Sequence, residues 1–253
     1  MLPRRTLLLA PLAALVGCGI GQAASSDYTI HRLTSTARGR KVAWSLIRPP
    51  GDGVFTAVIA LHGLGQDHTI TRSLGAGRLI PERHRFAIAA PDGGTSYWHP
   101  HRGEDAGAMV TDELLPRLAD LGLRTDRIGL LGWSMGGYGA LRLAGLLGPG
   151  RVAAVAAVSP ALWVDGADAS ASGFDDAAEY ARYSVLGRQH DLAGIPIRID
   201  CGADDPFAAA VRTYRAGFAT APAGRFSPGG HDRDYWRRVL PGELRWLGSR
   251  LAA

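Results

Sequence analysis

The sequence predicts a single α/β domain, in which a mostly parallel central sheet carries helices on both faces. Apolar runs of strand length alternate along the chain with longer segments of helical periodicity. Strands separated by helices are joined by right-handed crossovers, which make the sheet mostly parallel. The chain has 253 residues, 46% hydrophobic and 20% charged, which suits one large globular domain and excludes a largely disordered protein.

Six apolar runs are the expected strands. The run 54–62 is apolar at nearly every position, so we expect it near the centre of the sheet, covered on both faces. The run 85–94 ends at Pro91 and two glycines, which are typical of a turn. In chain order the expected strands are 41–48, 54–62, 85–94, 127–132, 151–160 and 195–202.

Four segments are the expected helices. The first, 111–122, is closed by Gly122, while Pro116 leaves the position of its start open. Residues 163–192 are rich in Ala, Asp, Ser and Gly without a clear period, so we expect an excursion between sheet elements there. The other expected helices are 135–147, 207–219 and 233–251.

Residues 1–26 are expected to be a signal segment and linker, which leaves 27–253 as the folded domain. Two arginines precede an apolar stretch, 7–16, that is too short for a membrane span of about 20 residues and fits a secretory signal. Residues 15–18 resemble the lipobox of bacterial lipoproteins, in which Cys18 would carry the lipid. Ordinary cleavage of the signal is the alternative.

We therefore expect an exported protein, either secreted to the cell envelope or held at a membrane only through that lipid. With Cys18 lipidated or removed, Cys201 is the only cysteine left, so no internal disulfide is expected. The net charge of +5 comes from arginines scattered among acids, with Lys41 the only lysine. Because nucleic acids are bound by clustered basic residues, we expect no nucleic-acid partner.

The sequence Gly-Trp-Ser-Met-Gly at 132–136 lies between an expected strand and an expected helix. This context gives the G-x-S-x-G pattern its meaning, because a serine in a sharp strand-to-helix turn projects its hydroxyl above the sheet. The helix N-terminus also points unpaired N–H groups toward the reacting oxygen. Ser134 is therefore the candidate nucleophile, and a glycine-rich turn with a capping serine is the alternative.

A serine hydroxyl needs a neighbouring base to act as a nucleophile. In this strand–turn–helix architecture the order along the chain is nucleophile, acid, base. His231 is the last of eight histidines, on a loop bracketed by glycines before the final helix, and it is the expected base. His99 and His101 bracket Pro100 and resemble metal ligands, but no Cys or carboxylate cluster supports a metal site, and none is expected.

The acid is expected just after the strand 195–202, where both Asp204 and Asp205 stand. We favour Asp205, because it lies three residues after Gly202 and directly before Pro206, as suits a turn at a helix start. Asp204 stays the alternative, and helix capping is an alternative role for either residue. The carboxylate would orient the imidazole and stabilise its protonated form.

Attack on an acyl group develops an oxyanion that needs two N–H donors. The expected donors are the backbone N–H of Met135, directly after the nucleophile, and that of Leu64, in the loop after the strand 54–62. We expect His62 to brace this loop through hydrogen bonds.

These segments resemble the α/β-hydrolase superfamily, and more narrowly the family that contains esterase D (S-formylglutathione hydrolase), feruloyl-type esterases and the antigen 85 mycolyltransferases. The resemblance implies the α/β-hydrolase fold and the same roles for Ser134, His231, Asp205 and the two oxyanion donors. Gly65 stands where the antigen 85 enzymes carry arginine, and their acid is glutamate, so their substrate is not carried over. The motifs, from about Val54 to Leu251, are HGLGQDH, PDGG, ELLPRL, RTDRIGLLGWSMGGYGAL, VSPALW, DCGADDPF and PGGHDRDYWRRVLPGELRWL.

The leading hypothesis is a serine esterase that acts on a small-molecule, lipid or sugar ester through an acyl-enzyme. The alternatives are an acyltransferase, in which a sugar or lipid hydroxyl replaces the water, and a catalytically silent surface binding protein. No phosphate-cradling glycine motif occurs, so no cofactor is expected. Four aromatic residues on loops could line a substrate pocket or pack as ordinary loop residues: Tyr97, Trp98, Trp163 and Phe207.

Overall fold

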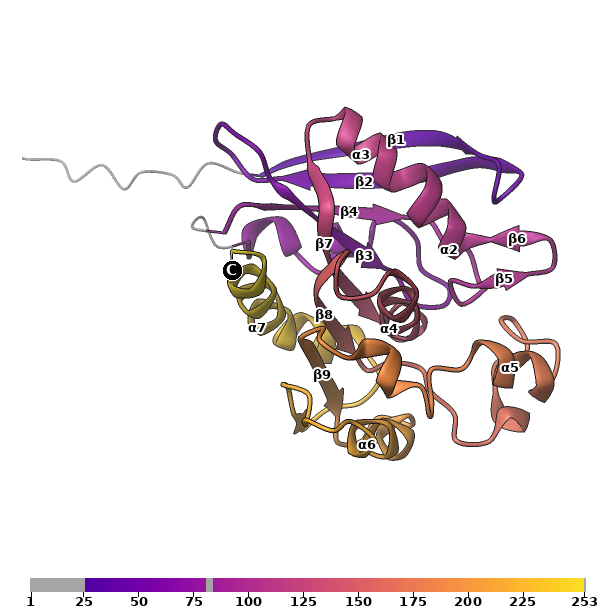
Figure 1. The fold of residues 1–253 in the computed structure, drawn as a ribbon. Helices are drawn as coiled ribbons and strands as arrows, with labels where there is room; N and C mark the ends of the chain where they lie inside the picture. The colour runs from indigo at the N-terminus through magenta and orange to yellow at the C-terminus, as the bar shows by residue number, and fades with distance from the viewer. Residues whose placement is uncertain (1–25, 81–83, 253) are drawn as a thin grey trace, which may run out of the picture.

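The computed structural model describes residues 26–80 and 84–252. The strands of its large sheet are β1 (Asp27–Ser35), β2 (Arg40–Arg48), β3 (Thr56–Leu61), β4 (Phe86–Pro91), β7 (Arg124–Trp133), β8 (Val152–Val158), β9 (Ile197–Gly202) and β10 (Phe226–Ser227). They lie in the order β1-β2-β4-β3-β7-β8-β9-β10 (Figure 1). All neighbouring pairs from β4 to β10 are parallel, while β2 runs antiparallel to β1 and β4. The prediction of a mostly parallel sheet is confirmed.

The central strand β3 shows why helices cover both faces of the sheet. All of its residues are buried, and they alternate between two apolar clusters, with Ile59 and Leu61 in one and Val58 and Ala60 in the other. Helices α4 and α7 lie on opposite sides of the sheet (Figure 1). The first cluster takes side chains from α3 (Leu115–Asp120), α4 (Met135–Leu147) and α6 (Ala208–Ala216), the second from α1 (Ile70–Ser73) and α7 (Arg233–Leu251).

The order of the strands reverses at β3. The next strand along the chain, β4, lies on one side of β3, and β7 lies on the other. In open α/β sheets such a reversal leaves a crevice at the carboxyl ends of the strands. The segments that follow β3 and β7, which carry Leu64 and Ser134, therefore meet at this edge.

The helical segment around Pro116 is longer than the expected range 111–122. It begins with α2 (Ala106–Ala108), continues through a π-helical stretch (Met109–Leu114) and ends with α3. The side chain of Asp105 caps its start by accepting a hydrogen bond from Ala108 N–H at 2.9 Å. Proline lacks an N–H, and its ring crowds the carbonyl four residues earlier, so a widened turn before Pro116 is the local form that accommodates it.

Several elements were not expected from the sequence. The strand β1 is mostly exposed at the edge of the sheet, so it has no apolar run that would have revealed it. A separate hairpin pairs β5 (Pro100–His101) with β6 (Glu104–Asp105). The excursion 163–192 contains α5 (Ala177–Tyr183) between two short 3-10 turns, η3 (Gly166–Asp168) and η4 (Gln189–Leu192).

The predicted signal segment and the lipidation site Cys18 lie outside the described residues. Among the residues that the structure does describe, no helix has the length and apolar character needed to cross a membrane. Cys201 is a buried free thiol.

Candidate active site

Ser134 occupies the sharp turn between β7 and α4. Its backbone has φ 55° and ψ −120°, a conformation that residues other than glycine rarely adopt. A Cβ on Gly132 would lie 2.0 Å from the Gly136 carbonyl oxygen, and a Cβ on Gly136 would lie 1.9 Å from the Leu61 carbonyl oxygen. Close backbone packing around the serine therefore requires both glycines of the motif.

Ser134, His231 and Asp205 form one hydrogen-bonded chain. His231 Nε2 lies 2.8 Å from Ser134 Oγ, and His231 Nδ1 lies 2.9 Å from Asp205 Oδ2. A neutral imidazole with its proton on Nδ1 donates to Asp205 and accepts from the serine hydroxyl. Three segments that are distant in the sequence thus meet at the carboxyl edge of the sheet.

Of the two aspartates that the sequence left open, Asp205 contacts the imidazole, whereas Asp204 is exposed. Asp205 is only 5% exposed, and its Oδ1 accepts a hydrogen bond from Phe207 N–H at 2.9 Å. Burial alone would raise the pKa of this carboxyl, but the hydrogen bonds from His231 and from the Phe207 N–H outweigh burial and lower it. The Asp205 side chain is therefore a carboxylate near neutral pH.

Gly202 lets the histidine loop pass close to the end of β9, since a Cβ there would lie 2.2 Å from the Gly229 carbonyl oxygen. Gly229 itself has φ 134°, which favours glycine. The rings of Phe207 and Trp236 meet the imidazole of His231 edge-on, at centroid distances of 5.0 Å and 5.3 Å. The His231 side chain keeps 21% of its surface exposed, so solvent or a substrate can still reach it.

The loop after β3 passes directly beside the serine, because a Cβ on Gly63 would lie 3.2 Å from Ser134 Cβ. The backbone N–H groups of Leu64 and Met135 donate a hydrogen bond to no other residue in the described part of the chain. Two free donors thus belong to the two backbone segments that border the serine hydroxyl.

His62 is fully buried and fixes the shape of this loop. Its Nε2 accepts a hydrogen bond from Gly93 N–H at 2.8 Å, so its Nδ1 carries the proton and donates to the Gly63 carbonyl oxygen, also at 2.8 Å. Gln66 Oε1 accepts from Gly63 N–H at 2.9 Å. These bonds hold the peptide unit that presents the Leu64 N–H. The roles of Gln66 and Gly93 were missed in the sequence, although both lie within the motifs HGLGQDH and PDGG.

The four aromatic residues considered for a substrate pocket take different positions. Trp98 is fully buried, and its indole fills the space beside Gly139, where a Cβ would lie 2.4 Å from the ring. Tyr97 is also buried and packs against Trp163. Trp163 and Phe207 are half-buried, with ring centroids 5.3 Å apart, and Phe207 contacts His231. Phe207 thus lies beside the imidazole with Trp163 packed against it, whereas Trp98 stays in the core, because its indole fills the space that glycine leaves.

His101 lies beside two carboxylates that come more than seventy residues later. Single ligand atoms of His101, Asp175 and Glu179 all lie within 4.8 Å of one another. The Nδ1 atom of His101 is 3.0 Å from Glu179 Oε1, while Arg102 Nε donates to Asp175 Oδ1 at 2.9 Å. Arg102 thus pairs with Asp175 and His101 with Glu179, and these contacts tie the β5–β6 hairpin to α5 and to the residue that precedes its N-cap.

Most of the chain matches one known protein family. The model of the family described as "Putative esterase" matches residues 35–247. The chain is a member of this esterase family. The resemblance that the ordered motifs predicted is thereby confirmed. No curated protein matches this esterase-family chain significantly by sequence.

Solved structures similar to this esterase-family member share its fold. A ferulic acid esterase superposes with a TM-score of 0.75 at 20% identity, covering 89% of this chain and 98% of that one. An S-formylglutathione hydrolase from Agrobacterium tumefaciens gives 0.77 at 20% identity, covering 91% and 97%. MPT51 from Mycobacterium tuberculosis gives 0.71 at 17% identity, covering 88% and 98%. The α/β-hydrolase fold predicted from the sequence is therefore confirmed.

Proposed function

We propose that this esterase-family chain is a serine hydrolase of carboxylic esters. The observation that carries the proposal is the hydrogen-bonded chain from Asp205 through His231 to Ser134. As Ser134 Oγ attacks the ester carbonyl carbon, His231 Nε2 takes the hydroxyl proton. Asp205 holds the imidazole in the required tautomer and stabilises the imidazolium that forms.

The attack turns the carbonyl oxygen into an oxyanion. The N–H groups of Leu64 and Met135, together with the positive N-terminal end of α4, stabilise this charge. The bond from carbon to the alcohol oxygen then breaks, and His231 returns its proton to the departing alcohol. Water attacks the acyl-enzyme while His231 accepts its proton, and the carboxylic acid leaves as the Ser134 hydroxyl is restored.

We assign the half-buried rings of Phe207 and Trp163 to the wall of the site that receives the ester. Phe207 contacts His231 directly, and Trp163 packs against Phe207, so the wall begins at the reacting imidazole. Aromatic side chains offer a large apolar surface at low entropic cost. The proposed substrates are small-molecule esters with a short acyl chain.

The test is hydrolysis of p-nitrophenyl esters of rising acyl length by the wild type and by Ser134→Ala. We expect wild-type activity to be highest for short acyl chains. It should fall at least about a thousandfold in Ser134→Ala, since the side chains of Ser134, His231 and Asp205 act as a unit. Ser249→Ala, which removes an exposed hydroxyl from α7, is the matched control and should keep full activity. Activity retained in Ser134→Ala would point to another nucleophile and reject the proposal.

A further inference from the structure

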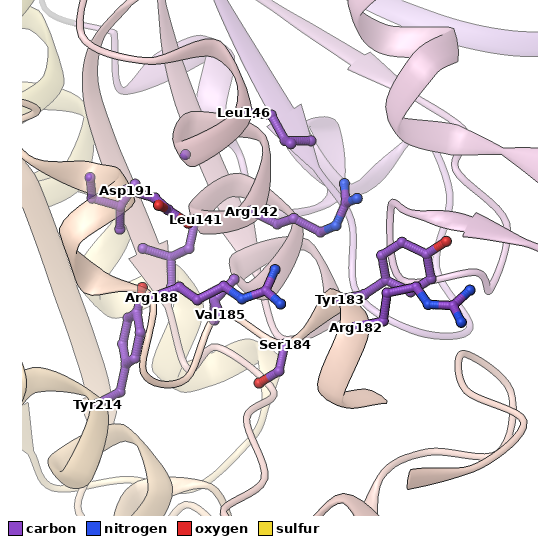
Figure 2. A pocket seen from close by; sticks show the side chains of 12 residues that line it. Leu141, Arg142, Leu146, Arg182, Tyr183, Ser184, Val185, Arg188, Asp191 and Tyr214 are labelled. Carbon is purple, nitrogen blue, oxygen red and sulfur yellow. The ribbon is translucent and has the colours of Figure 1, made fainter. Parts of the chain in front are cut away.

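A cavity of about 330 Å³ lies on the flank of α4, between that helix, the segment from α5 to η4, and α6 (Figure 2). Arg142 on its wall stands eight residues after Ser134, about 12 Å along the helix axis. The proposed ester hydrolysis uses none of the residues that line it. The cavity is therefore a separate feature of the fold.

The cavity gathers positive charge that carboxylates of the described residues do not neutralise by ion pairing. Its lining includes three arginines, Arg142, Arg182 and Arg188, against one aspartate, Asp191. Among the described residues, no carboxylate forms an ion pair with any of the three arginines, and the Asp191 carboxylate lies 3.1 Å from His190 Nε2 instead. In Figure 2, Arg142 and Arg188 extend in the same direction, toward the side where Arg182 lies.

Arg142 is the most constrained of these groups. Its guanidinium stacks over the ring of Tyr183, 5.2 Å from the centroid, and makes one long hydrogen bond, 3.4 Å, to the Trp98 carbonyl oxygen. Burial lowers the pKa of Arg142. The bond to Trp98 is the only hydrogen bond that this guanidinium makes within the described residues, so most of its five N–H donors have no acceptor there. Guanidinium groups form paired hydrogen bonds to oxyanions.

A buried hydroxyl on the wall of the cavity also lacks a partner among the described residues. Tyr214 is fully buried and lines the cavity, and its Oη has no hydrogen-bond partner among the described residues. In Figure 2 this hydroxyl points toward Leu141 on the cavity wall. A buried hydroxyl without a hydrogen-bond partner destabilises the fold unless something else supplies the bond. In Figure 2 it lies on the side of the cavity away from the Arg142 guanidinium, so it offers a neutral donor at a second point of the wall.

We propose that this cavity binds a small molecule that carries an oxyanion group with two or more negative charges, held by Arg142 and Arg188 and reached by the Tyr214 hydroxyl. Apolar side chains of Leu141, Val185 and Leu192 line the remaining wall, which suits an organic body attached to the charged group. Phosphate and carboxylate groups share this chemistry, and both fit a guanidinium pair.

The experiment is isothermal titration calorimetry with pyrophosphate and, in a second arm, citrate, at constant ionic strength. We expect saturable one-to-one binding of at least one of the two, and the arm that binds identifies the group as phosphate or carboxylate. Arg188→Gln and Tyr214→Phe should each weaken that binding, Arg188→Gln by at least about tenfold. Arg188 is exposed, so we expect Arg188→Gln to fold normally. Its affinity can therefore be measured even if a change at buried Tyr214 or at Arg142 disturbs folding.

Arg245→Gln is the matched control, because it removes one positive charge from an exposed position on α7, which packs on the opposite face of the sheet. It should leave the affinity unchanged. The proposal is overturned if neither anion binds the wild type, if Arg245→Gln weakens binding as much as Arg188→Gln, or if both cavity variants keep the wild-type affinity. Ester hydrolysis is measured separately, so this result does not depend on the proposed function.

Discussion

The Asp205 carboxylate governs the state of the histidine beside Ser134. It accepts from His231 Nδ1 on one oxygen and from Phe207 N–H on the other, so its position is fixed from two sides. Its lowered pKa keeps it charged near neutral pH. A charged acceptor at Nδ1 leaves Nε2 free to take the proton of Ser134, whereas a neutral amide in the same place could donate to Nδ1 and reverse the tautomer.

Asp205→Asn is therefore expected to reduce ester hydrolysis by about a thousandfold to ten-thousandfold while the protein stays folded. Asp204→Asn is the matched control, because the neighbouring side chain is exposed and does not reach the imidazole. Its activity should stay within about twofold of the wild type. The measurement is kcat/KM on one p-nitrophenyl ester, with circular dichroism to check folding. Equal losses in the two variants would reject the assignment of Asp205 as the acid.

The turn from β7 into α4 has room only for glycine at two positions, Gly132 and Gly136. Gly136 lies against the Leu61 carbonyl oxygen of β3, so this contact sets the distance between the helix that follows Ser134 and the strand that precedes the oxyanion loop. Protein interiors adjust poorly to added atoms at such contacts.

We expect Gly136→Ala to destabilise the protein by about 1–3 kcal/mol or more, because its Cβ would lie 1.9 Å from a backbone oxygen. Gly150→Ala adds the same methyl group where no other atom lies within 4 Å, and it should change stability by less than about 0.5 kcal/mol. Urea denaturation of the two variants provides the comparison. A Gly136→Ala protein as stable as the wild type would show that the turn is not constrained as described.

A second pair of elements, β9 and α7, is joined by a cluster of ionisable side chains. Arg198 Nε lies 2.7 Å from Asp200 Oδ2 and 3.0 Å from Glu243 Oε2, and Glu243 is fully buried. Burial, together with the neighbouring Asp200, raises the pKa of Glu243 well above its usual value. Glu243 therefore stays protonated in the folded protein at pH values at which it is already ionised in the unfolded chain.

Because the pKa of Glu243 is higher in the folded protein than in the unfolded chain, this residue makes the folded protein less stable as the pH rises. The stabilising contribution of protonated Glu243 is complete below its unfolded pKa of about 4.3 and is lost as the pH rises toward the raised folded value, by at most about 1.4 kcal/mol per pH unit. Glu243→Gln should remove this part of the pH dependence in urea denaturation between pH 5 and 9. Asp126→Asn, which changes an exposed side chain, should keep the wild-type slope. An unchanged slope in Glu243→Gln would contradict the assignment.

Across the whole molecule, the features that could be predicted from the sequence are those that a short run of neighbouring residues indicates. The buried strands β3 and β8 are nearly continuous apolar runs, and the serine turn carries its glycines within five residues. The edge strand β1 gave no such signal, since most of its side chains face water. Two features could not be predicted in this way, because each forms where segments distant in the sequence come together. They are the cluster of His101, Asp175 and Glu179 and the arginine-lined cavity beside α4.

We propose that residues 1–26 direct export and that Cys18 carries a lipid, the only membrane attachment expected. In a bacterial host that processes lipoproteins, the wild-type chain should enter the detergent phase on Triton X-114 partition, and Cys18→Ala should move to the aqueous phase. Cys201→Ser is the control and should partition like the wild type. Equal partition of wild type and Cys18→Ala would favour ordinary signal cleavage.

The most direct measurement for the proposed chemistry is labelling of the folded protein with a fluorophosphonate, followed by intact mass and peptide mapping. We expect a single adduct on Ser134, absent from Ser134→Ala and formed far more slowly by His231→Ala. An adduct on a different residue, or no adduct on a protein shown to be folded, would contradict it.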